Sequence, residues 1–149
     1  MAILSWGKCT ITKTTSSNGT PTNNWTAIDT PKEDTTKLTT TAGTEQTAVE
    51  EGGGIVDARN SKSTYQLEFD LFVKKGGTRP FTDDDGVVDG EFGFRVVPED
   101  STCEGIQIDR AIVRVEETYS TAEGKLLHHV VRCLRPATGK TVKPYTHGT

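Results

Sequence analysis

Thr64 to Lys75 reads TYQLEFDLFVKK, and this stretch decides the fold. Apolar and polar residues alternate along it, so every second side chain falls on the same face of an extended strand. The apolar face consists of Tyr65, Leu67, Phe69, Leu71 and Val73. Only Phe72 interrupts the polar face. A period of two over ten residues predicts a half-buried strand in an antiparallel sheet.

Other segments rich in β-branched and aromatic residues predict further strands. They are Ala2–Trp6 with Lys8–Thr14, Trp25–Ile28, Phe92–Val96, Ile106–Tyr119 and Lys125–Leu134. Thr is the commonest residue, and its branched Cβ favours extended backbone. The sequence therefore predicts an all-β fold, an antiparallel β-sandwich or partly closed barrel with one short flanking α-helix. A chain of 149 residues without a linker fits a single domain, 1–149.

The short helix is predicted in Phe81–Gly90, where Thr82 or Asp83 is a suitable N-cap and carboxylates occupy the first turn. The same segment supplies a candidate acidic surface, formed by Asp83, Asp84, Asp85 and Asp89. A calcium loop needs Asp at its first position and Glu at its twelfth. Placing Gly86 at position six puts phenylalanine at both. No metal site is predicted there.

Thr35 to Glu51 reads as a polar hairpin with a turn at Ala42-Gly43, followed by a glycine bend and a strand at Ile55–Arg59. Few of these residues can anchor in a core. We therefore expect residues 35–59 to form a protruding, mobile hairpin in the isolated chain. The polar C-terminal tail, 136–149, is expected to fray or to dock on a neighbouring copy.

No segment carries a recognisable catalytic or cofactor-binding motif. Thr138–Thr141 resembles the end of a phosphate loop, but the first glycine position of that motif holds Leu134. His128 and His129 are adjacent in a predicted strand and so point to opposite faces. The three cysteines have no metal-binding spacing and are read as reduced thiols. We predict no catalytic residue, no cofactor and no metal, and hence a protein that is not an enzyme.

The distribution of charge argues against nucleic-acid wrapping. The net charge is −4, and no basic stripe runs along the chain. Residues 1–50 sum to −1, residues 51–100 to −5 and residues 101–149 to +2, an asymmetry that suits contact between like copies. The apolar patch at the N-terminus is too short for a membrane span.

The overall layout resembles the major tail (tail tube) proteins of bacteriophages and prophages, nearly from end to end. The resemblance rests on MAILSWGK, the Thr-, Glu- and Gly-rich segment Leu38–Arg59, STYQLEFDLFVKK, DDDG, VVPEDSTCEGIQID and IVRVEETYSTAEGKLL, in this order. It implies a tail-tube-like β-sandwich or barrel with one flanking helix. It also implies a structural subunit that self-assembles into hexameric rings, stacked around a DNA-conducting channel.

The resemblance further implies the partners and the location of the protein. Family members use a long β-hairpin and the chain termini to connect rings, and the hairpin maps to residues 35–59 here. The candidate inter-subunit residues are Thr39, Thr41, Glu45, Val49 and Glu51. The implied partners are further copies, other tail proteins such as the tape measure, and DNA passing without sequence readout, with no membrane partner. The implied location is the virion tail, and the bacterial host cytoplasm during assembly.

Two alternatives remain open at the level of sequence. One is a ligand-binding β-sandwich, such as a carbohydrate-binding or adhesion module that uses Trp6 and Trp25. The other is a different virion component, such as a decoration or head–tail joining protein.

Overall fold

The computed structural model describes residues 4–146. All regular elements among them are β-strands. In chain order they are β1 (Thr10–Ser17), β2 (Thr20–Pro21), β3 (Thr26–Ala27), β4 (Lys37–Thr41), β5 (Glu45–Val49), β6 (Ile55–Asn60), β7 (Thr64–Phe72), β8 (Glu91–Val97), β9 (Gly105–Ser120), β10 (Gly124–Cys133) and β11 (Val142–Tyr145). The all-β prediction is confirmed.

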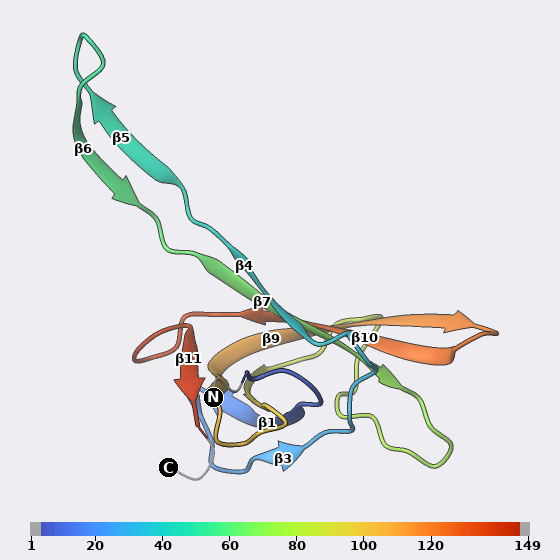
Figure 1. The fold of residues 1–149 in the computed structure, drawn as a ribbon. Helices are drawn as coiled ribbons and strands as arrows, with labels where there is room; N and C mark the ends of the chain where they lie inside the picture. The colour runs from blue at the N-terminus through green and yellow to red at the C-terminus, as the bar shows by residue number, and fades with distance from the viewer. Residues whose placement is uncertain (1–3, 147–149) are drawn as a thin grey trace.

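Nine strands form one antiparallel sheet that curls into a half-barrel, and β5 and β6 form a small second sheet (Figure 1). The order across the large sheet is β2-β1-β8-β9-β10-β7-β4, with β3 paired to β1 and β11 paired to β9. The opening strand begins at Thr10, later than predicted. Of the predicted segment Ala2–Trp6, residues 2 and 3 lie outside the described residues, and residues 4–6 form no strand.

The concave side of the half-barrel holds the core, as the alternation in β7 predicts. Leu67, Phe69 and Leu71 are buried there together with side chains from β1, β8, β9 and β10. Tyr65 and Leu38 are half-buried against the edge of this cluster. Val73 is 40 % exposed. Strand β7 ends at Phe72, so the alternation of apolar and polar residues no longer directs the side chain of Val73 into the core.

Strand β9 is long enough to pair with two strands in succession along one edge. Its first residues pair with β11, and from Ala111 onward it pairs with β10. The expectation of an unanchored tail is therefore wrong for residues 142–145. An ion pair from the Lys143 ammonium to the buried Asp109 carboxylate holds β11 in place, and Gln107 Nε2 also donates to Asp109 at 2.7 Å.

The helix predicted at Phe81–Gly90 does not form. Asp85 and Gly86 have φ values of 50° and 93°, which no α-helix tolerates. Gly86 O accepts a hydrogen bond of 3.0 Å from Val115 N, so the loop closes against the free edge of β9. Phe81 and Val88 at the two ends of the loop enter the core. Burial of these two side chains and pairing with β9 outweigh the local preference for a helix turn.

Candidate functional site

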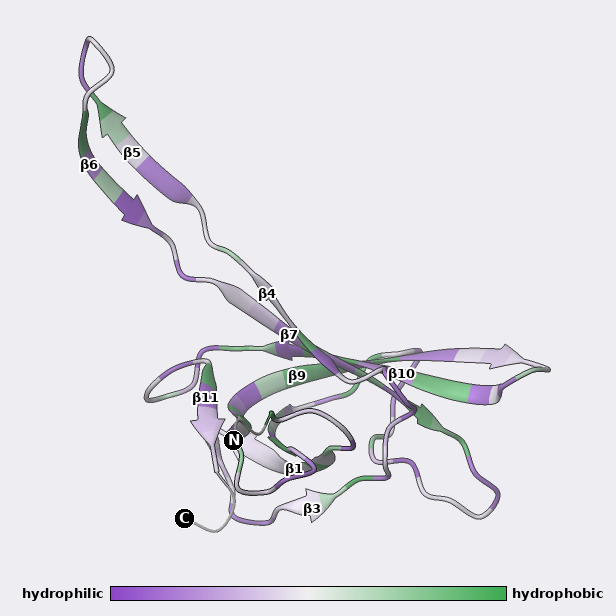
Figure 2. Ribbon diagram, in the orientation of Figure 1, coloured by the Kyte–Doolittle hydropathy of each residue, from purple (hydrophilic) through white to green (hydrophobic). Residues whose placement is uncertain are grey.

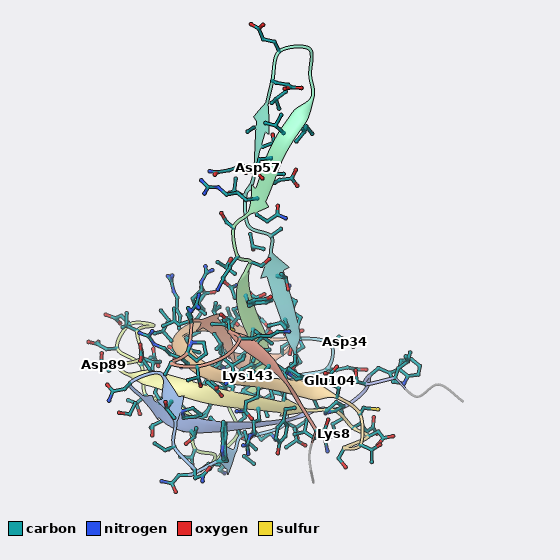
Figure 3. The ribbon with its side chains drawn as sticks, turned by 90° about the vertical axis from the view of Figure 1, so that its left-hand side faces the viewer. Lys8, Asp34, Asp57, Asp89, Glu104 and Lys143 are labelled. Atoms are coloured by element: carbon teal, nitrogen blue, oxygen red, sulfur yellow. The ribbon has the colours of Figure 1, made fainter. Side chains whose placement is uncertain are left out.

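A two-stranded arm projects from the half-barrel, and it is the most exposed part of the described chain (Figures 1 and 3). We define the arm as Glu45–Asn60, which contains β5, β6 and the turn between them. We define the root as β4 with the facing part of β7, Thr64–Glu68. The root is fixed to the body because Leu38, opposite Leu67, packs against the core.

The arm turns at its glycines and not at Ala42-Gly43. Gly52 and Gly53 have φ values of 94° and 92°, a region that glycine adopts without steric cost. Glu50 N donates to Gly54 O at 2.9 Å and closes the turn. The predicted pairing of Thr35–Thr41 with Glu45–Glu51 is therefore wrong. Strand β4 pairs with β7, and β5 pairs with β6.

Residues 42–44 and 61–63 form the junction between root and arm. Ser61 N donates to Thr44 O at 2.8 Å, and the two chains approach so closely at Gly43 that a Cβ there would lie 2.0 Å from Ser61 O. The junction thus requires glycine for close backbone approach, whereas the tip requires it for positive φ.

Every residue of the arm is exposed, including apolar ones (Figure 2). Val49, Ile55 and Val56 are 57 %, 66 % and 63 % exposed. Val49 lies opposite Ile55 in register, so these two share a face, and Val56 lies at the irregularity where the register shifts between Ala48 and Val49. The arm also carries four carboxylates and one guanidinium. An isolated two-stranded hairpin is marginally stable in water, and exposed apolar residues of this kind are typical of interaction surfaces.

The five predicted hairpin residues divide between root and arm. Thr39 and Thr41 lie on β4, Glu45 and Val49 lie on β5, and Glu51 lies in the tip turn. Because Thr39 and Thr41 pair with β7, they belong to the root. Ile55 and Val56 were not among the predicted residues. An apolar pair directly after a glycine run, with no core for it to enter, is the signal that would have identified them.

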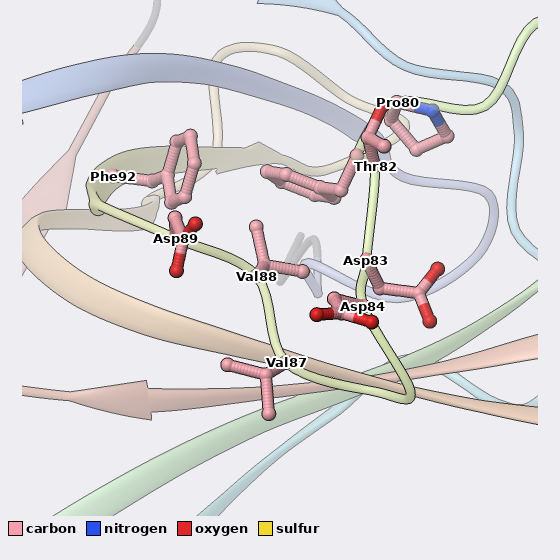
Figure 4. Close-up of a pocket in the computed structure, with 9 residues that line it drawn as sticks. Pro80, Thr82, Asp83, Asp84, Val87, Val88, Asp89 and Phe92 are labelled. Atoms are coloured by element: carbon pink, nitrogen blue, oxygen red, sulfur yellow. The ribbon is translucent and has the colours of Figure 1, made fainter.

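The four predicted acidic residues lie in the loop 81–90, and three of them line one pocket. Asp83, Asp84 and Asp89 line a shallow pocket of about 360 Å³ over Phe81 and Phe92, and Asp85 is not among its lining residues (Figure 4). Asp83 Oδ2 accepts from Gly86 N at 3.0 Å, so this carboxylate stabilises the loop. Among the described residues no group of three His, Cys, Asp or Glu side chains is arranged to hold a metal ion.

A row of charged side chains crosses the outer face of the sheet at the root. Lys37 on β4, Glu68 and Asp70 on β7, and His128 on β10 form it. His128 Nδ1 lies 2.5 Å from Asp70 Oδ1, and its Nε2 lies 3.4 Å from Glu68 Oε1. Lys37 Nζ lies 3.6 Å from the other oxygen of Glu68. Partial burial lowers the pKa of His128, but the adjacent carboxylates outweigh it and raise the pKa above 6.5.

The two tryptophans have different surroundings. Trp6 is 76 % exposed. Trp25 stacks on the Arg95 guanidinium, 4.0 Å from its ring centre, and Tyr145 contacts the same guanidinium at 4.6 Å. One ring face of Trp25 is thus occupied from within the chain. The stack connects β8 to β11 and to the segment before β3.

We expect Arg95→Ala to lower the free energy of unfolding by about 2 kcal/mol, since it removes two cation–π contacts and a hydrogen bond to Gln107. Arg95→Lys keeps the charge but not the planar stacking surface, so its free energy of unfolding should lie between those of the unmodified protein and Arg95→Ala. Urea denaturation measures the loss. Arg132→Ala, an exposed arginine on β10, is the control and should change stability by less than about 0.5 kcal/mol. If Arg95→Ala and Arg132→Ala lowered the free energy of unfolding equally, the stabilising role of the Arg95 stack would be contradicted.

No helix among residues 4–146 is long and apolar enough to cross a membrane. No protein-family model and no curated protein matches the chain.

Proposed function

We propose that this protein is a structural, self-assembling subunit of a phage or prophage tail tube, without enzymatic activity. In this proposal it forms stacked hexameric rings around a DNA-conducting channel. The observation that carries the proposal is the arm, a projecting hairpin whose apolar side chains Val49, Ile55 and Val56 are exposed.

A second copy of the chain is the partner that this geometry favours. β4 ends the large sheet, and within residues 4–146 no strand pairs with its other edge. Unpaired strand edges and an exposed arm are hazards in a monomer unless a neighbour covers them. An arm that contacts a different surface of the next copy makes a head-to-tail interface, and such interfaces generate rings or filaments.

The charge distribution supports assembly of like copies. The middle third of the chain is acidic and the last third is basic, so unlike regions of two copies attract each other. In the proposed tube, DNA passes without sequence readout and the tape-measure protein is a further partner. The assembled protein resides in the virion tail, after assembly in the bacterial host cytoplasm.

Negative-stain electron microscopy of the concentrated protein, together with light scattering over a dilution series, tests the proposal. We expect rings or tubes of a single width that dissociate on dilution. A species that stays monomeric at every concentration contradicts the proposal. Closed rings that never stack would contradict the tube and favour another virion component, such as a head–tail joining protein.

A further inference from the structure

The arm is attached to the body through one strand pairing. Among residues 4–146, strand β4 pairs with β7 alone, and β7 is joined to the rest of the sheet by its pairing with β10 over Gln66–Phe72. Contacts between β7 and β10 therefore decide how firmly the root is held. On the outer face of the sheet, the charged contacts among them include those that His128 makes with Asp70 and Glu68.

Only the protonated imidazole satisfies both carboxylates. An imidazolium has two N–H donors, so Nδ1 donates to Asp70 while the positively charged Nε2 edge makes an ion pair with Glu68 at 3.4 Å. In the neutral ring that keeps the bond to Asp70, Nε2 becomes an acceptor lone pair. This lone pair then faces a carboxylate oxygen at 3.4 Å, which is repulsive.

The remaining charged groups around His128 favour the same protonated state. On β9, Glu116 lies directly opposite His128 in register and adds negative charge. Arg114 Nε lies 3.8 Å from Glu116 Oε1, and both side chains of this pair are mostly exposed, so it compensates only in part. On β4, the Lys37 ammonium forms an ion pair with Glu68 Oε2 and offsets part of the negative charge of that carboxylate. Lys32 Nζ forms an ion pair with Glu123 Oε2 at 2.8 Å.

We propose that His128 is a proton-operated clamp at the root of the arm. Protonated, it bridges Asp70 and Glu68 and holds β7 against β10. Neutral, it releases Glu68 and loosens the root. The clamp acts within one chain, so the inference goes beyond the proposed function and does not depend on assembly.

The sign of the effect follows from the direction of the pKa shift. Because the pKa of His128 is raised in the folded protein, its stabilising contribution is fully present below the unfolded value of 6.5. The contribution is lost as the pH rises through the folded value. This window lies above pH 6.5, where the buried His129, with its pKa lowered to about 4, is neutral in the folded protein and mostly neutral when unfolded.

Hydrogen–deuterium exchange of peptides covering 37–41 and 64–72, at about pH 6.5 and about pH 8.5, tests the clamp. After correction for the intrinsic exchange rate, we expect the root to exchange about threefold faster at the higher pH, a modest factor because the pair is partly exposed. In His128→Gln the two rates should be equal. Glu116→Gln is the matched control, since it removes a neighbouring carboxylate but leaves the clamp, and should retain the difference.

A direct titration of His128 by NMR in the unmodified protein needs no variant. A pKa above 6.5 that falls in Asp70→Asn supports the clamp. A pKa at or below 6.5 overturns it, and so does a His128→Gln protein that keeps the same pH-dependent exchange in the root. An exchange difference that appears equally in the arm and throughout the core also overturns it, because the clamp acts on the root alone.

Discussion

Acidification from about pH 6.5 to about pH 4 is expected to remove on the order of 3 kcal/mol from the free energy of unfolding through His129 alone. His129 is 1 % exposed, and its ring stacks on Phe69 with 4.8 Å between ring centres. Burial lowers its pKa to about 4, although its Nδ1 lies 3.1 Å from the Leu127 carbonyl oxygen. The folded protein therefore keeps His129 neutral, while the unfolded chain takes up a proton below pH 6.5.

The direction of this dependence is fixed by the depressed pKa. The contribution of neutral His129 is present above the unfolded pKa of 6.5 and is lost as the pH falls toward the folded value of about 4. Below that value the slope from this residue vanishes, because both states then bind the proton. Urea denaturation at a series of pH values measures the slope.

Replacement of His129 separates its contribution from that of the carboxylates. His129→Phe keeps an aromatic ring against Phe69 and cannot titrate, so the free energy of unfolding of the unmodified protein should fall relative to that of the variant as the pH falls. His128→Gln is the control, because His128 with its raised pKa is protonated in both states at low pH. If the free energies of unfolding of the unmodified protein and of His129→Phe changed in parallel with pH, the prediction would be refuted.

Removal of the arm is expected to weaken assembly strongly while leaving the body folded. Thr44 and Ser61 are already joined by a backbone hydrogen bond of 2.8 Å, so an Asn-Gly turn can replace Glu45–Asn60 between them. None of the removed side chains belongs to the core. We expect the free energy of unfolding to change by less than about 1 kcal/mol, and the concentration needed for assembly to rise by about a hundredfold or more.

Single substitutions in the arm identify the position that contacts the neighbour. Ile55→Thr and Val56→Thr each replace an exposed aliphatic side chain by a polar one at adjacent positions of β6 and preserve its preference for extended backbone. Light scattering and electron microscopy should show a larger defect for one of the two. Normal tubes from the armless protein would contradict the role of the arm, and an unfolded armless body would show that the arm is needed for folding.

The strands that form the body were predictable because their burial leaves a period of two in the sequence. The alternation of β7 and the hairpin of β9 and β10 are of this kind. The loop 81–90 was not predictable, because its conformation depends on Val115 and on a core far away in sequence. Strand β11 was missed because only four residues form it and because Pro144 has no backbone N–H to donate to a neighbouring strand.

The candidate site was predictable in outline but not in register. A segment with few core anchors indicates a protruding hairpin, and residues 35–60 contain one. The position of its turn was wrong because Ala42-Gly43 and Gly52-Gly53-Gly54 are both plausible turns locally. The choice is made by pairing of β4 with β7, which local signals do not report. His128 and Glu68 likewise meet only through strand pairing.

The pairing of β1 with β8 sets the order in which this chain can fold. Thr10 pairs with Val97, so one edge of β1 has no partner until a much later segment is synthesised, whereas its other edge pairs with the nearby β2 and β3. Closure of so long a loop is slow, whereas β9 and β10 are adjacent in sequence and can pair within microseconds. During synthesis on the ribosome, β1 therefore emerges long before its sheet exists, and its polar, threonine-rich sequence suits such a delay.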